Sequence, residues 1–488
     1  MKNKRIKLLS LLVIIAIICI NIIGYYNQKI DISMNLTFAT VITAFGLYII
    51  ITTNKEFIFD LRFIVVGFYY LYNYYVPLVY ILNDNKYITY MNKNNFSFSH
   101  ETLLNAMYNS NIYLIGLILG TTLLVVKRKD LNLNTKRVSI NFWLIIYSLA
   151  NIWYIYPYFK IGIREALELD RWSRYIVFGQ IKNVGGIANI LNLFFSNILI
   201  LLAIAMICKS YLEDINSKYK KFIFYIVVTF QSIFWLFIDV RRREVLYLVI
   251  IIFLLYKLTF NFKIRSKHIL ALIAIGSMFL GYQYVKNYFP VLIKDGFSAA
   301  IEQYKVDNSR KNSTEKLLQN EFGMVYVNNL YIADNYIEKE NGRTYIEATL
   351  KNIPFFDYIL YEWLDFERTY IISDIMTEGY ADIYNSGGGL GFSPSAEAAV
   401  NFGNGSFGVM LIGFLTGGII SFLMMLFYKP KYIILYSLLL VQGVNFCRIT
   451  LVGVTQEVIW IFIYYIMYRT VENIIFKRNK SIRRINNV

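Results

Sequence analysis

The chain has 488 residues, of which 57% are hydrophobic and only 17% charged, a composition that excludes an ordinary soluble domain. The net charge is +17, but most Lys and Arg residues lie beside apolar runs, which predicts membrane-flanking anchors and not a nucleic-acid-binding surface. The three cysteines lie in apolar runs without pair spacing, and there are only two histidines. The sequence therefore predicts neither a disulfide framework nor a metal site.

Long apolar runs recur along the chain and predict membrane-spanning helices, because lipid leaves backbone groups only intra-segment hydrogen-bond partners. The first run, LLSLLVIIAIICINIIGYY, is too long for a signal peptide and lacks a small-x-small cleavage site, so we interpret it as a retained span. The pattern predicts about twelve spans. They cover approximately residues 7–26, 34–52, 63–82, 105–126, 140–158, 188–208, 222–238, 245–260, 269–286, 406–428, 432–448 and 456–472.

The connections between these runs alternate in charge. NKEFIFDLR, KRKDLNLNTKR, KSYLEDINSKYKK, NFKIRSKH and KPK form one basic set, together with both basic termini. The positive-inside rule places this set in the cytoplasm, and an even number of spans independently places both termini on one side. The sequence thus predicts a multi-pass plasma-membrane protein with two cytoplasmic termini.

One outward connection, about 287–405, is far longer than the others. It contains short helical-looking stretches such as STEKLLQNEFGMVYVNNLYI, and loops of this length without structure are unusual. We therefore predict three parts. They are a transmembrane bundle of nine spans (1–286), a mostly helical extracytoplasmic loop domain with a re-entrant Gly-rich segment (287–405), and the last three spans with a basic cytoplasmic tail (406–488).

The turn IDVRRREVLYLV places Arg241, Arg242 and Arg243 on the predicted outer side, against the charge bias of the other tight turns. Arginine offers a rigid fork that binds phosphate bidentately and stays charged at any working pH. The alternative is headgroup anchoring, with Asp239 and Glu244 as local ion-pair partners. The charge bias favours an anion-binding role.

A second outward group of arginines lies in REALELDRWSRY, where Arg171 and Arg174 share one face at helical spacing. An interfacial amphipathic helix with Trp172 and Tyr175 at headgroup depth explains this pattern equally well. Arg448 ends the apolar run LLLVQGVNFCRIT at the predicted membrane boundary, where Glu457 is a potential partner. A charge at such depth marks either a functional site or a structural ion pair.

The segment NSGGGLGFSPSAEAAVNFG combines a glycine-rich turn with a predicted short helix. Gly389 and Gly391 allow close backbone approach to a ligand, and Pro394 suits the first turn of a capped helix. On that helix Glu397 and Asn401 are four residues apart and share a face. A partly desolvated Glu397 would have a raised pKa and could act as a general base. The alternative is a re-entry turn in which Glu397 makes a structural ion pair.

These features resemble the Wzy-type oligosaccharide repeat-unit polymerases of O-antigen and capsule synthesis. GGGLGFSPSAEAAVNFG before a late span is similar to a family segment, as is GRTYIEATLKNIPFF in the long loop. The span plan and the arginine turn resemble the family as well. One departure is FFDYILYEW, where the family often has tryptophan and lysine after Ile-Pro. The motifs cover about thirty residues.

The resemblance implies a metal-independent membrane glycosyltransferase with a GT-C-like, all-α architecture and no cofactor. Its substrates would be undecaprenyl-pyrophosphate-linked oligosaccharides on the outer face of a bacterial plasma membrane, with a chain-length regulator as a further partner. It implies that Glu397 and Arg242 are catalytic. It also implies that Arg241, Arg243, Arg171, Arg174, Arg448, Gly389, Gly391 and Asn401 bind substrate.

Two other functions stay open on sequence alone. A lipid-linked oligosaccharide flippase would place charges near the middle of its spans and often shows internal repeats. The predicted spans are nearly free of charge and show no repeats, which favours the polymerase. An O-antigen ligase would perform the same chemistry with a different acceptor.

Overall fold

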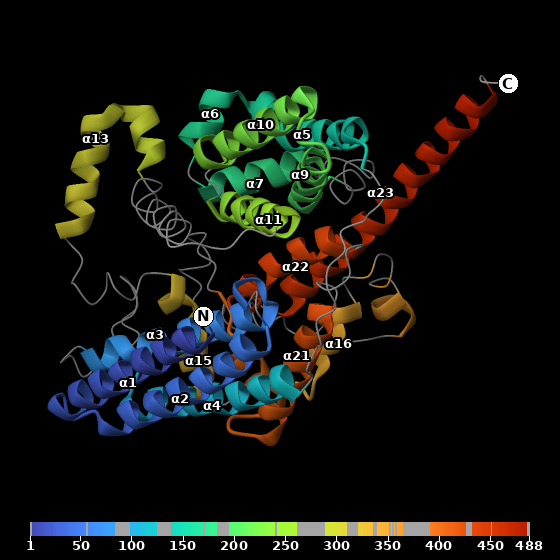
Figure 1. Cartoon of the computed structure of the whole chain (residues 1–488). Helices are drawn as coiled ribbons and strands as arrows, with labels where there is room; N and C mark the ends of the chain where they lie inside the picture. The colour runs from blue at the N-terminus through green and yellow to red at the C-terminus, as the bar shows by residue number, and fades with distance from the viewer. Residues whose placement is uncertain are drawn as a thin grey trace. The chain divides into compact units, whose positions relative to one another are not determined.

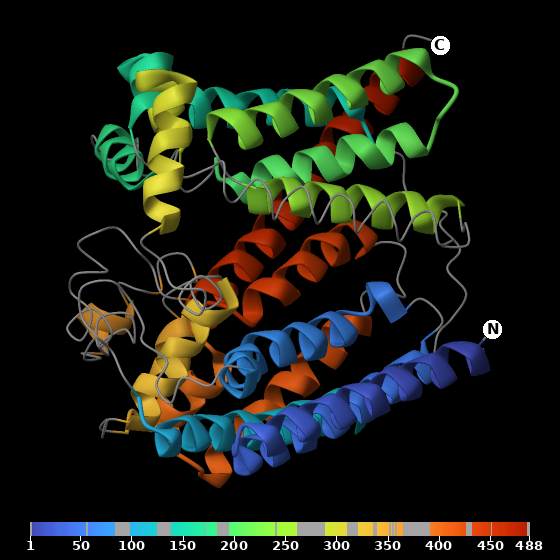
Figure 2. The same ribbon diagram turned by 90° about the vertical axis from the view of Figure 1, so that its left-hand side faces the viewer.

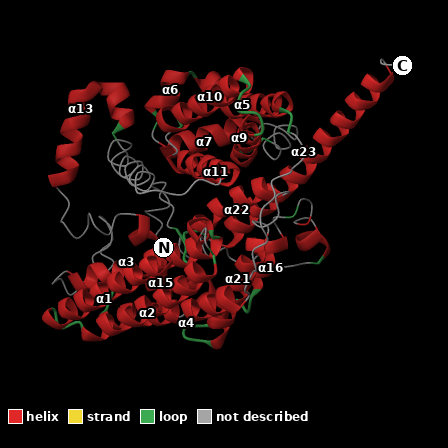
Figure 3. Ribbon diagram, viewed as in Figure 1, coloured by secondary structure: helices red, strands yellow, loops and turns green. Residues whose placement is uncertain are grey.

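The computed structural model (Figure 1) contains helices joined by turns and loops. It describes residues 2–54, 57–82, 98–123, 138–169, 171–182, 195–239, 242–260, 288–309, 321–334, 339–350, 353, 356, 359–364, 391–425, 432–449 and 451–485. Within these ranges there is no strand (Figure 3). The prediction of an all-α protein is therefore confirmed for the described part of the chain.

Five helical segments are long and apolar enough to cross a membrane: Ile30–Thr53, Leu61–Leu82, Lys218–Ile238, Phe407–Met424 and Gly453–Ile475. They coincide with five of the predicted spans. Three shorter apolar helices, Ser10–Tyr26, Asn197–Leu212 and Ile433–Phe446, lie at three others. The predicted spans at 140–158 and 245–260, and the described part of 105–126 up to residue 123, are helical but belong to neither group. The predicted span at 269–286 lies outside the described residues. The helices fit an α-helical membrane protein, while the number twelve stays a prediction.

The chain divides into two compact units. Unit 1 is Met1–Leu131, Asn312–Tyr432 and Leu439–Ile459, and unit 2 is Asn132–Lys311, Ile433–Leu438 and Trp460–Val488. Unit 1 contains α1 (Lys2–Tyr26), α2 (Ile30–Thr53), η1 (Phe57–Phe59), α3 (Leu61–Leu82), α4 (His100–Leu123), α15 (Glu321–Asp334), α16 (Arg343–Leu350), η3 (Ile359–Trp363), α20 (Pro394–Phe402) and α21 (Phe407–Met424). Unit 2 contains α5 (Ile140–Ile161), α6 (Ile163–Glu168), α7 (Arg171–Lys182), α9 (Asn197–Leu212), α10 (Lys218–Ile233), η2 (Phe234–Ile238), α11 (Arg242–Phe260) and α13 (Phe289–Ser309). The residues of α22 (Ile433–Phe446) and α23 (Leu451–Ile485) are shared between the units.

The described helices of the predicted 287–405 segment belong to different units. α13 is part of unit 2, whereas α15, α16, η3 and α20 are part of unit 1. Their helical character agrees with the expectation for this segment. Its identity as one extracytoplasmic loop domain stays a prediction.

Unit 1 is built around a close crossing of α4 and α21, while α1, α2 and α4 lie side by side (Figures 1 and 2). Each crossing helix carries a Gly-x-x-x-Gly motif, with Gly116 and Gly120 on α4 and Gly413 and Gly417 on α21. A Cβ atom at any of these four positions would overlap the backbone of the facing helix. Small residues that allow such backbone approach are a common basis of helix association in membranes. This crossing links the first hundred or so residues to the segment after α20.

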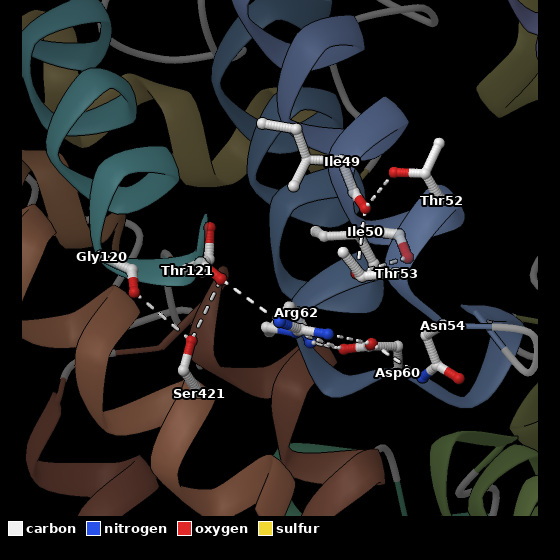
Figure 4. A network of polar contacts seen from close by, with 10 residues as sticks. All are labelled: Ile49, Ile50, Thr52, Thr53, Asn54, Asp60, Arg62, Gly120, Thr121 and Ser421. Atoms are coloured by element: carbon white, nitrogen blue, oxygen red, sulfur yellow. Dashed lines mark hydrogen bonds and ion pairs between the residues drawn. The ribbon is translucent and has the colours of Figure 1, made fainter. Parts of the chain in front are cut away.

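A buried polar network lies near one end of this crossing (Figure 4). The Arg62 guanidinium pairs with Asp60 at 2.7 Å and also donates to the Thr121 carbonyl at 3.4 Å. The side-chain amide of Asn54 donates to the Asp60 carboxylate at 2.9 Å. Ser421 of α21 donates to the same Thr121 carbonyl at 3.2 Å. An ion pair buried this deeply persists because its hydrogen-bonding groups are satisfied, and it joins α3, α4 and α21.

Candidate functional site

The short helix α20 begins at Pro394, as the sequence predicts, and ends at Phe402; Gly403 follows as the C-cap, and its φ of +89° favours glycine. The predicted side-chain cap is wrong. Ser393 occupies the N-cap position, but its hydroxyl accepts no capping bond from a backbone N–H of the first turn and instead donates to the Asn73 side chain at 2.7 Å. The start of α20 is thus held by a distant helix, α3, and not by its own cap.

Glu397 lies in the first turn of α20 and is 2% exposed. One carboxylate oxygen accepts a hydrogen bond of 2.9 Å from the backbone N–H of Leu451, the first residue of α23. No cation pairs with this carboxylate among the described residues. Burial raises the pKa of Glu397 to about 7, although the bond from Leu451 lowers it in part. Near neutral pH this group can therefore accept or release a proton.

Asn401 joins the two segments that carry the family resemblance. Its amide donates to Thr344 at 2.6 Å and to the Glu397 carbonyl at 2.8 Å, and its oxygen accepts from Gly342 N–H at 3.0 Å. The Asn341 N–H also donates to the Asn401 carbonyl, at 2.9 Å. The motif GRTYIEATL is thereby fixed against SPSAEAAVNF. Asn401 is fully buried, and its predicted role in substrate binding stays a prediction beside this structural one.

Arg448 and Gly391 meet through the backbone. The Phe392 N–H donates to the Arg448 carbonyl at 2.8 Å, and a Cβ atom at Gly391 would crowd that carbonyl. The Gly391 carbonyl accepts from the Asn328 amide of α15. Leu451, whose N–H binds the Glu397 carboxylate, follows three residues after Arg448. The α22–α23 turn therefore contacts both Phe392, next to Gly391, and Glu397. The backbone of Arg448 thus lies beside Phe392 and Gly391, while its predicted role in substrate binding stays a prediction.

The predicted partner of Arg448, Glu457, makes a described contact elsewhere. Its carboxylate accepts from the Asn445 amide at 3.1 Å, and that amide also donates to Gln442 at 2.7 Å. Asn445 in turn bonds the backbone of Arg448, whose N–H donates to the Asn445 carbonyl at 2.9 Å. Gln442, Asn445, Arg448 and Glu457 thus form one polar cluster around the turn between α22 and α23.

The arginines of α7 and of the central turn belong to unit 2. Arg174 is 5% exposed, and its guanidinium donates to the carbonyls of Ile238 at 2.7 Å and Leu169 at 3.1 Å. It therefore holds the end of η2 against the α6–α7 turn. Asp239, at the end of η2, accepts from the hydroxyls of Tyr154 and Tyr158. Arg174 and Asp239 together fix the backbone that leads into the arginine turn.

The arginine turn itself is described only in part. Arg243 is half-buried, pairs with Glu244 at 3.1 Å and lies over the ring of Tyr247 at 5.6 Å, which agrees with the local ion pair considered from the sequence. Arg242 is the first residue of α11 and Arg171 the first of α7. Arg241 and Gly389 lie outside the described residues. Their predicted roles, like those of the side chains of Arg242 and Arg171, stay predictions.

Sequence reasoning missed the polar residues that surround α20. Asn73, Ser110, Asn329 and Ser395 are all buried, and they bond one another across four helices. A signal was present: Asn73 interrupts the apolar run of α3, and polar residues inside predicted spans are costly and often functional. The two Gly-x-x-x-Gly motifs were also readable as a helix-packing signal.

Two groups in this site can act chemically. The carboxyl of Glu397 can transfer a proton near neutral pH, and the partly buried Arg448 places a guanidinium group at the α22–α23 turn. The described residues contain no cluster of His, Cys, Asp or Glu that could hold a metal ion. Comparisons with protein-family models, with curated proteins and with solved structures give no match.

Proposed function

We propose that this protein polymerises lipid-pyrophosphate-linked oligosaccharides at the outer face of a bacterial plasma membrane, with Glu397 as the general base. The observation that carries the proposal is the carboxyl of Glu397, which is buried, has a pKa near 7 and has no ion-pair partner among the described residues. A general base is most effective when its pKa lies near the working pH. The resemblance supplies the substrate class.

In the proposed reaction a sugar hydroxyl of one lipid-linked unit attacks the anomeric carbon of the growing glycan. Glu397 takes the hydroxyl proton while the new C–O bond forms. The bond between the anomeric carbon and the pyrophosphate oxygen breaks, and lipid pyrophosphate leaves with the electron pair. The energy comes from the sugar–pyrophosphate bond, so the step needs no nucleotide.

The charge that develops on the leaving pyrophosphate needs cationic partners. Arg448 is the candidate in unit 1, because its backbone contacts the segment that contains Glu397. The resemblance alone also gives Arg241, Arg242, Arg243, Arg171 and Arg174, which belong to unit 2, as candidates. The contacts of Arg174 with backbone carbonyls support a positioning role for this residue, in which it fixes the turn that presents the other arginines.

The direct test is elongation by the purified full chain in detergent, with synthetic undecaprenyl-pyrophosphate-linked repeat units as the only substrate. We expect a ladder of longer lipid-linked glycans and release of undecaprenyl pyrophosphate. A flippase gives no elongation in detergent, where no sealed compartment exists. Transfer to a lipid A core in place of the lipid-linked unit would identify a ligase. Absence of any glycan transfer would contradict the proposal.

A further inference from the structure

Asn73 of α3 lies at the centre of a buried polar cluster in unit 1 and is itself fully buried. Its side-chain oxygen accepts from Ser393 at 2.7 Å and from Ser395 at 3.1 Å, both at the start of α20. It also accepts from Asn329 of α15 at 2.9 Å and from Ser110 of α4 at 3.4 Å. One oxygen atom therefore gathers polar groups from three other helices.

The orientation of this amide is fixed from its other end. The Asn73 side-chain nitrogen donates to the Tyr69 carbonyl, one turn earlier in α3, at 3.0 Å. This bond directs the oxygen toward α20. A buried amide is costly unless its bonds are made, and here both ends are satisfied. The cluster is thus specific to one geometry of α20 relative to α3.

The contact reaches Glu397 through the first turn of α20. The Glu397 N–H donates to the Ser393 carbonyl at 3.1 Å, so the residue that Asn73 holds by its hydroxyl also anchors the backbone of Glu397. Because α20 has no side-chain cap of its own, the hydroxyl bonds to Asn73 take the place of a cap. Loss of Asn73 would free the turn that aims the carboxyl at Leu451.

We propose that Asn73 is a positioning residue that holds the start of α20 and thereby keeps the Glu397 carboxyl in its buried contact with the α23 N-terminus. This inference rests on the proposed function for its kinetic consequence. Its structural consequence, the environment of Glu397, is independent of that function. The reason for a polar residue inside an otherwise apolar run of α3 is then the placement of a distant carboxyl.

The surroundings of Glu397 limit what else could control its protonation. Tyr113 of α4 and Tyr345 of α16 interact with it electrostatically. α21, which packs on α20, contains no ionisable residue. Other ionisable or charged groups on the described elements around α20 include His100, Glu101 and Tyr108 on α4, Glu321, Tyr326, Tyr331 and Asp334 on α15, Arg343 and Glu347 on α16, and Cys447, Arg448 and Glu457 around the α22–α23 turn. Asp334 accepts from Thr102 of α4 at 2.6 Å.

The first part of the test is kinetic, on the full chain in detergent. Asn73→Ala should lower the kcat of elongation by about 10- to 100-fold, because small displacements of a catalytic group are costly, while KM changes little. Asn73→Asp keeps an acceptor oxygen for the two serine hydroxyls but loses the N–H that binds the Tyr69 carbonyl, so it should restore only part of the rate. Asn111→Ala is the matched control: Asn111 is also buried, on α4, and bonds Tyr74 at 2.6 Å and Asn35 at 3.2 Å without touching α20. Its kcat should stay at the wild-type value.

The second part measures the titration of Glu397 directly, by infrared spectroscopy of the carboxyl band. The band is isolated by subtracting the spectrum of the same protein with Glu397→Gln. Wild type and Asn111→Ala should titrate near pH 7, whereas Asn73→Ala should titrate at lower pH as the freed carboxyl gains water. If Asn73→Ala does not fold, the double variant Ser393→Ala, Ser395→Ala removes the same bonds from the other side.

An unchanged infrared midpoint in folded Asn73→Ala or in the double-serine variant would overturn the positioning role. If wild-type protein does not elongate glycans but its Glu397 midpoint falls on loss of Asn73, the proposed function fails and the positioning role stands.

Discussion

The two regions that contain the predicted site residues differ in how their charges are bound. In unit 1 the Glu397 carboxyl is buried with one backbone hydrogen bond and no described cation, so its proton is labile near neutral pH. In unit 2 the Arg174 guanidinium donates hydrogen bonds to backbone carbonyls, and Asp239 accepts hydrogen bonds from two tyrosine hydroxyls. Arg243 pairs with Glu244 and lies over the ring of Tyr247. The first region fits the proposed proton transfer, whereas the described contacts of the second hold a turn in place.

This difference shows what two kinds of sequence signal mean. The glycine, serine and asparagine residues of the motif segments encode specific contacts, which the structure forms. The role of the arginines was inferred from charge bias. Charge bias indicates on which side of the membrane a turn lies, but it does not indicate which groups the arginine side chains contact. The contacts in unit 1 therefore support the proposed role of the Glu397 carboxyl. Those in unit 2 support a role for the turn that Arg174 and Asp239 hold.

Glu397→Gln should have the largest effect on activity, a fall in elongation rate of about 10²- to 10⁴-fold, because amide nitrogen and oxygen cannot accept the acceptor proton. The variant should still fold, since its side-chain oxygen can keep the Leu451 bond. Glu302→Gln, at an exposed acid of α13 in unit 2, is the control and should retain the wild-type rate. Comparable loss in both variants would erase the distinction between the two regions.

The same substitution should change the pH dependence of stability. The pKa of Glu397 is raised in the folded protein, so the folded state holds its proton more tightly than the unfolded state does. That contribution is fully present below about pH 4.5 and is lost as pH rises through about 7, and it amounts to about 3 kcal/mol. Tm measured from pH 4.5 to 8 should fall more steeply in wild type than in Glu397→Gln. Parallel Tm curves would show that the carboxyl is not buried as described.

The glycine crossing of unit 1 should be sensitive to a single methyl group. Gly417→Ala places a Cβ atom against the Leu117 carbonyl of α4 and should destabilise the protein by about 1–3 kcal/mol. The neighbouring Gly418→Ala meets no atom within 4 Å and should be neutral or slightly stabilising. Thermal unfolding in detergent distinguishes them, and equal Tm values would contradict the close crossing.

Arg242→Lys should have the smallest effect. It keeps the charge but loses the bidentate fork, so we expect a roughly tenfold lower elongation rate with unchanged expression. Full activity would remove Arg242 from the pyrophosphate site. Full activity of Arg242→Lys would also make the difference between the two units larger, because the turn held by Arg174 and Asp239 would then be the main feature of unit 2.

Much of the local structure could be predicted from the sequence. Apolar runs gave helices, Pro394 marked the start of α20, and the spacing of Glu397 and Asn401 placed them on one short helix. The contacts of that helix could not be predicted, because they join segments that are distant in the sequence: Asn73 and Ser393 are 320 residues apart, and Glu397 and Leu451 are 54 apart. Periodicity reports which face is apolar and carries no information about which polar residue of another helix meets it.

The pH dependence of kcat for elongation by the purified chain tests the central claim most directly. If Glu397 is the base, the rate should rise with pH through an apparent pKa near 7, and Glu397→Gln should leave only a residual rate without that limb. A rate that is flat from pH 5 to 9 in wild type, or a Glu397→Gln protein with the wild-type rate and profile, would contradict it.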